Sequence, residues 1–200
     1  MKVKAVLFDL DGVLLDSTNA WWETFNDVLR HYSRKTITRR KFITEVFGEP
    51  IEDDIKRYFP EASIKDLESL YCRYFPKHTR EVRVFKGAIE LLKELKKKKI
   101  RTGLVTNTPR KLVKTTLKAK KLEKLLDVVK TPNDVKAGKP NPEMLFKAME
   151  ELKVSKKETI LVGDTKIDIQ AAKKAGIHAI GIGIKGDRTI KDIRDLKSIG

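Results

Sequence analysis

The chain has 200 residues, 40% of them hydrophobic, which suits one domain of substantial size or one domain with an insert. Its single cysteine, Cys72, excludes an internal disulfide and a cysteine metal cluster, and no run of eighteen apolar residues indicates a membrane span. The net charge of +16 is typical of nucleic-acid binders, but the lysines are spread among Asp and Glu, so solvated helix faces explain most of them and we expect no nucleic-acid partner.

The apolar run Val3–Phe8 predicts a buried strand that leads directly into Asp9-Leu10-Asp11-Gly12. In open α/β sheets, ligands bind at the carboxyl ends of the strands. Side chains alternate along an extended chain, so Asp9 and Asp11 would point the same way. Two such charges about 4 Å apart repel by about 4 kcal/mol at an effective dielectric of 20, and a divalent cation would offset that repulsion. A strand that ends in an ordinary Asp-Gly turn is the alternative.

Residues 16–84 show helical patterns and no convincing strand, which predicts a helical insert after the first strand. The helices are expected over residues 17–32, 39–47, 51–58 and 64–75. The insert begins behind the Asp9/Asp11 loop, so it would cover that loop like a lid. Its aromatic side chains lie at helical spacing and are expected to form core rather than a cofactor site; they are Trp21, Trp22, Phe25, Tyr32, Phe42, Tyr71 and Tyr74.

From residue 85 onward, strand-like and helical patterns alternate, which predicts a parallel, three-layer α/β sheet. Further strands are expected over residues 101–106, 126–129, 159–162 and 179–184, and helices over residues 88–98, 110–122, 142–152 and 168–175. The predicted fold is therefore a Rossmann-like parallel sheet with an inserted, all-helical cap. We expect residues 1–15 and 85–200 to form the core and residues 16–84 to form the cap.

Three later segments place polar side chains at strand ends. Thr106 and Asn107 offer donors for anion oxygens, although such a pair also caps helices. Asp164 follows a strand and Asp168 lies one helical turn further on, so the two suit a cation site, whereas helix capping alone would leave Asp168 unexplained. Lys139 lies in a turn restricted by glycine and proline, where an ordinary surface lysine is the alternative.

In order and approximate spacing, these segments resemble the four motifs of the haloacid dehalogenase-like hydrolase superfamily. The insert is similar to the helical cap of the subgroup that includes phosphoglycolate phosphatase, β-phosphoglucomutase and some pyrophosphatases. Two departures from the pattern, Lys99 in place of a frequent glycine and Leu126 in place of a usual aromatic, touch no catalytic position. The matching segments are Asp9-Leu10-Asp11-Gly12, Thr106-Asn107, Lys139-Pro140, and Gly163-Asp164 with Asp168.

This resemblance implies a Mg²⁺-dependent phosphoric monoester hydrolase of a small phosphorylated metabolite, with phosphoglycolate as the default substrate. It implies that Asp9 is the nucleophile and becomes an aspartyl phosphate. Asp11 would be the general acid and base, protonating the leaving alkoxide and then taking a proton from water. The alternatives are a phosphomutase or pyrophosphatase of the same superfamily and, from another class, a catalytically idle nucleic-acid-binding protein.

The resemblance also implies the residues that bind phosphate and metal. Lys139 would stabilise charge on the nucleophile and would bind the substrate phosphate together with Thr106 and Asn107. The Mg²⁺ would be held by the carboxylate of Asp9, the backbone carbonyl of Asp11, and Asp164, with Asp168 acting through water or from behind the direct ligands.

In the resembling subgroup the cap sets the substrate, and Phe47-Gly48-Glu49-Pro50 resembles the cap loop that faces the site. Four basic residues of the insert would either meet a substrate carboxylate or phosphate or be solvated; they are Arg39, Arg40, Lys41 and Arg57. The expected partner is a small phosphorylated substrate and not a membrane. The expected compartment is the cytoplasm, and the expected assembly is a monomer or a homodimer.

Overall fold

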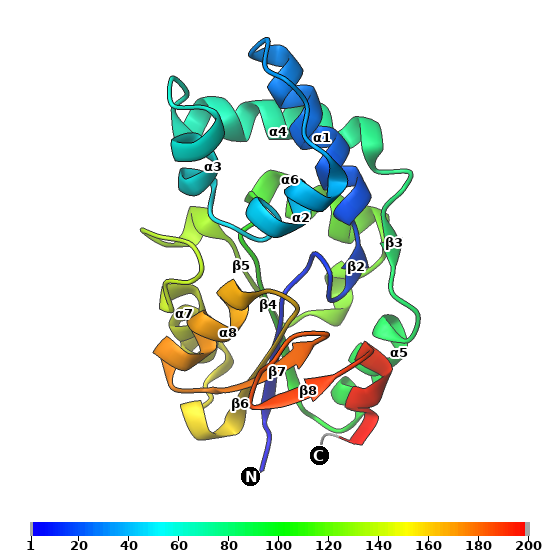
Figure 1. Cartoon of the computed structure of the whole chain (residues 1–200). Coiled ribbons are helices and arrows are strands. Elements are labelled where there is room, and N and C mark those ends of the chain that lie inside the picture. Colours follow the sequence, from blue (N-terminus) through cyan, green and yellow to red (C-terminus); the bar gives the residue numbers. More distant parts are fainter. Residues whose placement is uncertain (1, 199–200) are drawn as a thin grey trace.

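Six parallel strands form one sheet in the order β5-β4-β1-β6-β7-β8 in the computed structural model, which describes residues 2–198 (Figure 1). β1 lies in the middle, hydrogen-bonded to β4 on one side and to β6 on the other. The predicted parallel α/β sheet is confirmed. The strands are β1 (Ala5–Phe8), β4 (Arg101–Val105), β5 (Val128–Lys130), β6 (Thr159–Gly163), β7 (His178–Ile182) and β8 (Arg188–Ile190).

The side chains of β1 are buried on both faces of the sheet. Val6 and Phe8 enter one hydrophobic cluster, and Ala5 and Leu7 enter another, because side chains alternate along a strand. Helices cover each face of the sheet, as Figure 1 shows, so the sheet is the middle layer of a three-layer structure. The helices are α5 (Ala88–Lys97) and α6 (Arg110–Ala119) on the first face, and α7 (Glu143–Leu152) and α8 (Lys166–Ala175) on the second.

Four more helices form a helical insert, α1 to α4, above the carboxyl ends of the strands (Figure 1). The ring of Phe25 packs against Phe42, Tyr58 and Phe59 at centroid distances of 5.7, 5.1 and 5.4 Å, so aromatic side chains form the interior of the insert as predicted. The helices are α1 (Thr18–His31), α2 (Arg39–Glu45), α3 (Ile51–Tyr58) and α4 (Ile64–His78).

Three short strands were not predicted. β2 (Leu15–Asp16) pairs antiparallel with β3 (Arg83–Val84), so the expectation of no strand within residues 16–84 is wrong. Elements of two residues are too short to leave a periodic pattern. β8 was missed because it is an edge strand in which only Ile190 is buried.

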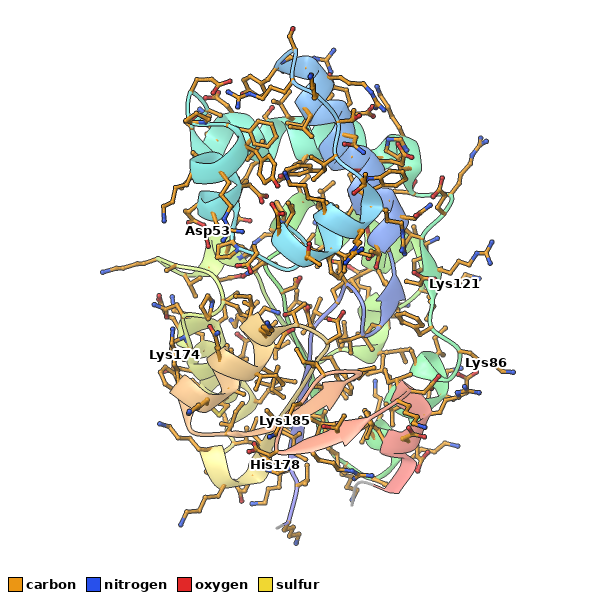
Figure 2. All side chains as sticks on the ribbon, viewed as in Figure 1. Asp53, Lys86, Lys121, Lys174, His178 and Lys185 are labelled. Carbon is orange, nitrogen blue, oxygen red and sulfur yellow. The ribbon has the colours of Figure 1, made fainter. Side chains whose placement is uncertain are left out.

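Basic side chains are spread over the surface. Lys86 and Lys121 lie on one side of the molecule in Figure 2, and Lys174 lies on the other. This distribution agrees with lysines that solvate helix faces. None of the described helices has the length and apolar character that a bilayer crossing needs.

Candidate active site

The predicted site residues meet at the carboxyl edge of the sheet. The N–H of Asp9 donates to the carbonyl of Val162 at 3.0 Å, so Asp9 extends the pairing of β1 with β6 by one residue. The N–H of Thr106 donates to the carbonyl of Lys130 at 3.2 Å at the end of β4. Parallel strands therefore deliver these polar side chains to one edge, as their order along the chain predicted.

Lys139 is a buried cation between two carboxylates. Its side chain is 2% exposed, and Nζ lies 2.9 Å from Asp9 Oδ1 and 2.6 Å from Asp168 Oδ1. Burial alone would lower the pKa of Lys139, but the charges of Asp168 and Asp9 outweigh burial and raise it above its ordinary value. The lysine is therefore charged, and the alternative of a surface turn lysine is wrong.

Asp168 has a second set of partners at the start of α8. Its Oδ2 accepts hydrogen bonds from the backbone N–H of Thr165 at 3.1 Å and from its hydroxyl at 2.5 Å. These bonds close a capping box at Thr165. Capping therefore accounts for only one oxygen of Asp168, because the other oxygen holds Lys139.

The side chain of Asn107 fixes the backbone around Lys139. Its Oδ1 accepts from the N–H of Lys139 at 2.8 Å, and its Nδ2 donates to the Lys139 carbonyl at 2.9 Å. The same Nδ2 donates to the carbonyl of Gly48 in the insert at 3.1 Å. Asn107 thus joins three segments of the chain, in addition to the predicted role in phosphate binding.

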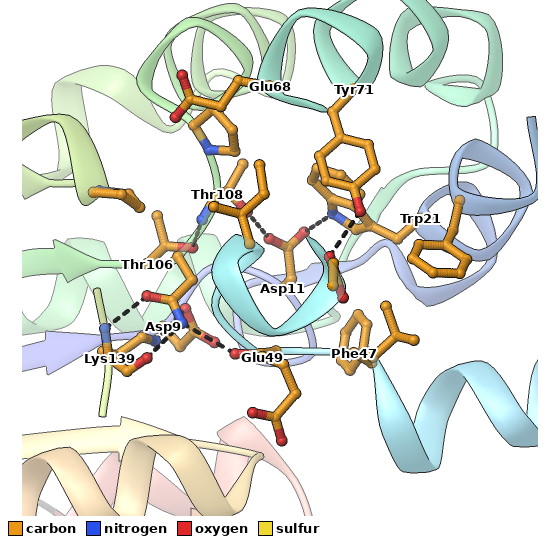
Figure 3. Close-up of a pocket in the computed structure, with 18 of the residues that line it drawn as sticks. Asp9, Asp11, Trp21, Phe47, Glu49, Glu68, Tyr71, Thr106, Thr108 and Lys139 are labelled. Carbon is orange, nitrogen blue, oxygen red and sulfur yellow. Dashed lines mark hydrogen bonds and ion pairs between the residues drawn. The ribbon is translucent and has the colours of Figure 1, made fainter. Parts of the chain in front are cut away.

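Asp11 accepts hydrogen bonds from three side chains that sequence reasoning did not place in the site. Ser17 Oγ donates to Oδ1 at 2.5 Å. Trp21 Nε1 donates to the same oxygen at 2.9 Å, and Thr108 Oγ1 donates to Oδ2 at 2.6 Å, as Figure 3 shows. Ser17 and Thr108 lie next to quoted motifs, which is a weak signal. The sequence around Trp21 gave no signal of a place in the site, because an aromatic residue at helical spacing is typical of a hydrophobic core.

Three carboxylates form a close acidic group. Oxygens of Asp9, Asp164 and Asp168 lie within 4.8 Å of one another. Burial, with added repulsion from like charges, raises the pKa of Asp9 to about 7 and that of Asp164 to about 8. Asp164 Oδ1 is buried and has no hydrogen-bond partner among the described residues. Gly12, at φ +81°, permits this arrangement, because a Cβ there would overlap the Asp164 carboxylate.

A cavity with about 730 Å³ of empty space, part of it open to solvent, separates the sheet edge from the insert. Its size suits a small-molecule ligand. Asp164 and Asp168 are not among the residues that line it. The core contributes Asp9, Asp11, Thr106, Asn107, Thr108 and Lys139, and the insert contributes aromatic and acidic side chains that include Trp21, Phe47, Glu49, Asp54, Glu68 and Tyr71.

Asp54 makes the stability of the insert depend on pH. Burial raises the pKa of Asp54 to about 8, from 3.8 in an exposed chain. Between about pH 4 and pH 8 the unfolded chain loses this proton while the folded protein keeps it, so folding becomes less favourable as pH rises. We expect Asp54→Asn to raise the melting temperature relative to wild type at about pH 8 and not at about pH 4. Thermal unfolding followed by circular dichroism tests this, and an equal effect at both pH values would contradict it.

Residues 6–182 match the model of the haloacid dehalogenase-like hydrolase family. Among curated relatives, pyrophosphatase PpaX of Bacillus mycoides is 32% identical over 183 residues, which are 91% of this chain and 84% of the relative. Pyrophosphatase PpaX of Halalkalibacterium halodurans is 32% identical over 194 residues, 96% of this chain and 89% of the relative.

Solved structures share the whole architecture. CbbY from Rhodobacter sphaeroides, solved with phosphate, aligns at a TM-score of 0.85 and 21% identity over 98% of this chain and 96% of that one. β-Phosphoglucomutase from Clostridium difficile aligns at a TM-score of 0.84 and 21% identity over 98% of this chain and 94% of that one. At such identity these likenesses show the fold alone. The family match and the curated relatives go further: the chain belongs to the haloacid dehalogenase-like hydrolase family.

Proposed function

We propose that the protein is a Mg²⁺-dependent phosphatase that hydrolyses a small phosphorylated metabolite through an aspartyl phosphate. One observation carries the proposal: Asp9 is at the cavity floor, with the buried ammonium of Lys139 2.9 Å from its Oδ1. A cation fixed beside a carboxylate favours its ionised form against the effect of burial and neutralises charge on an incoming phosphoryl group. Thr106 and Asn107 line the same floor, where the hydroxyl of Thr106 and the backbone N–H of Asn107 would donate to the phosphoryl oxygens.

The proposed reaction has two steps. An oxygen of Asp9 attacks phosphorus while the bond from phosphorus to the leaving-group oxygen breaks, and Asp11 gives that oxygen a proton. Water then attacks the aspartyl phosphate and loses a proton to Asp11. The Asp9–phosphorus bond breaks, inorganic phosphate leaves, and both carboxyl groups return to their starting states.

The hydrogen bonds of Asp11 indicate which oxygen carries the proton. Oδ1 accepts from the indole N–H of Trp21, and an indole N–H is only a donor. Oδ2 faces the hydroxyl of Thr108, which can donate to a carboxylate and accept from a carboxylic acid. Oδ2 is therefore the oxygen suited to exchange a proton.

The residues present fit Mg²⁺. The carboxylates of Asp9, Asp164 and Asp168 crowd together where Asp9 lines the cavity, and Asp164 Oδ1 lacks a hydrogen-bond partner among the described residues. Both oxygens of Asp168 already bind Lys139 and Thr165, so direct ligation falls to Asp9, Asp164 and the Asp11 carbonyl, with Asp168 behind them. When bound, the ion would supply positive charge beside the phosphoryl oxygens.

The metal assignment predicts an effect on stability as well as on activity. Mg²⁺ is expected to raise the melting temperature, because it binds the folded site and relieves repulsion among buried carboxylates. Asp164→Asn is expected to remove most of that rise, whereas Asp53→Asn, on the exterior of α3, is expected to keep it. Differential scanning fluorimetry with MgCl₂, and with NaCl at equal ionic strength, measures the effect. A full Mg²⁺-induced rise in Asp164→Asn would contradict the assignment.

The function is tested by phosphate release from p-nitrophenyl phosphate with Mg²⁺ and with EDTA. The second candidate is pyrophosphate hydrolysis, which the names of the curated relatives favour. A panel with phosphoglycolate, pyrophosphate and sugar phosphates separates the candidates. A phosphomutase would convert a sugar phosphate without stoichiometric release of phosphate.

A further inference from the structure

The walls of the cavity that belong to the insert are acidic. The insert contributes three carboxyl groups to the lining, those of Glu49, Asp54 and Glu68, and it contributes no Lys, Arg or His. The lining residues include one cation, Lys139, and its ammonium already pairs with Asp9 and Asp168. The part of a substrate that extends beyond the phosphoryl group therefore meets no unpaired cation among the described residues that line the cavity.

The basic residues that sequence analysis offered for substrate recognition lie elsewhere. Arg57 Nη1 donates to the carbonyl of Glu45 at 2.8 Å, and Arg39 Nε donates to Asn19 Oδ1 at 3.0 Å. Arg39, Arg40, Lys41 and Arg57 are all exposed, and none lines the cavity. Of the two alternatives for these residues, solvation agrees with their positions.

Asp54 is the acidic side chain best placed to distinguish substrates. It is 6% exposed and lines the cavity from α3. Its Oδ2 accepts a hydrogen bond from the hydroxyl of Tyr71 at 2.7 Å, and Figure 3 shows that this hydroxyl points into the cavity. Among the described residues, Asp54 has no ion-pair partner. A buried carboxyl group without a cation is costly, which also explains its raised pKa.

We propose that the site takes phosphomonoesters whose leaving group bears no negative charge and presents a hydroxyl or ammonium donor to Asp54. This inference rests on the proposed phosphatase function and narrows its substrate class. A carboxylate or second phosphate at this position would lose water beside an acidic wall without gaining a cation. A hydroxyl or ammonium would instead give Asp54 a further donor beside the hydroxyl of Tyr71.

Two matched pairs of substrates test the inference. O-Phosphoethanolamine and O-phosphoserine differ by one carboxylate, and glycerol 3-phosphate and 3-phosphoglycerate differ by a hydroxymethyl in place of a carboxylate. We expect kcat/KM to favour the carboxylate-free member of each pair by about 10-fold or more. Comparison of the two pairs shows whether an ammonium or a hydroxyl is preferred. Pyrophosphate and phosphoglycolate are expected to be poorer than glycerol 3-phosphate.

In assays at about pH 9, above the pKa of about 8 that burial gives Asp54, Asp54→Asn is expected to bring the ratio within each pair to about 3-fold or less, because the amide removes the negative charge and keeps the shape. The matched control is Asp53→Asn, a neighbour on α3 that does not line this cavity, and its ratios are expected to equal those of wild type. Wild-type preference for the carboxylated members, faster pyrophosphate hydrolysis than glycerol 3-phosphate hydrolysis, or unchanged ratios in Asp54→Asn would overturn the inference.

Calorimetry with the Asp9→Asn protein and Mg²⁺ separates this inference from the proposed function. If wild type hydrolyses no phosphoester, including p-nitrophenyl phosphate, the phosphatase proposal fails, but the four ligands can still be ranked by binding. Tighter binding of the carboxylate-free members supports the inference. Tighter binding of the carboxylated members, or no binding of any, overturns it.

Discussion

Asp9→Asn is expected to reduce phosphate release by about 10⁴-fold or more, because an amide cannot replace a carboxylate as the attacking group. The fold should survive. The substitution removes one of three crowded carboxylates, and Lys139 keeps its 2.6 Å contact with Asp168. The melting temperature without metal is therefore expected to equal or exceed that of wild type. Steady-state release of phosphate from p-nitrophenyl phosphate and thermal unfolding measure the two effects.

The control for Asp9→Asn is intact mass, which shows that the asparagine has not deamidated to aspartate. The aspartyl phosphate itself is expected in wild type quenched during turnover, as a gain of one phosphoryl group, and is expected to be absent in the variant. A variant that keeps about one tenth of wild-type activity or more would contradict the assignment of Asp9 as nucleophile.

Lys139→Met is expected to destabilise the fold by about 3–5 kcal/mol and to abolish activity, because two buried carboxylates lose their shared cation. The lysine is almost wholly buried, so water cannot replace it without rearrangement. Lys174→Met is the matched control: this lysine is exposed on α8, and its replacement should change stability by no more than about 0.5 kcal/mol. Urea unfolding monitored by circular dichroism gives both values.

A double variant separates the two roles of Lys139. Adding Asp168→Asn to Lys139→Met removes one of the stranded charges, so part of the lost stability should return. Activity should not return, because Asp9 still lacks its cation. Unchanged stability in the double variant, or a single variant as stable as wild type, would contradict the role of Lys139 as a buried bridge.

The sequence predicted those parts of the site in which a polar residue directly follows a strand of the parallel sheet. Asp9 directly follows an apolar strand, and the ends of parallel strands share one edge, so its meeting with Thr106 follows from the sequence pattern, whereas the place of Lys139 beside Asp9 was implied only by the family resemblance. The family resemblance was confirmed by the family model, which matches residues 6–182. The residue roles remain predictions, which the substitutions above test.

Other features of the site depend on how helices are rotated and seated. Trp21 donates to Asp11 only because α1 turns its indole toward the sheet. The acidic lining near Asp54 follows from which side of α3 faces the cavity, and α3 is too short for its pattern to indicate that side. The two oxygens of Asp168 have different partners, which no spacing rule reveals.

The antiparallel pair β2–β3 brings the two ends of the helical insert together, because Asp16 lies opposite Arg83. The insert can therefore be regarded as a module that could be exchanged between relatives without changing the path of the sheet. Such an exchange would not be neutral for chemistry. Ser17 and Trp21 belong to the exchanged segment, and both donate to Asp11. Evolution of a new substrate preference through the insert would thus also alter the surroundings of the proposed acid–base group, and selectivity and turnover would change together.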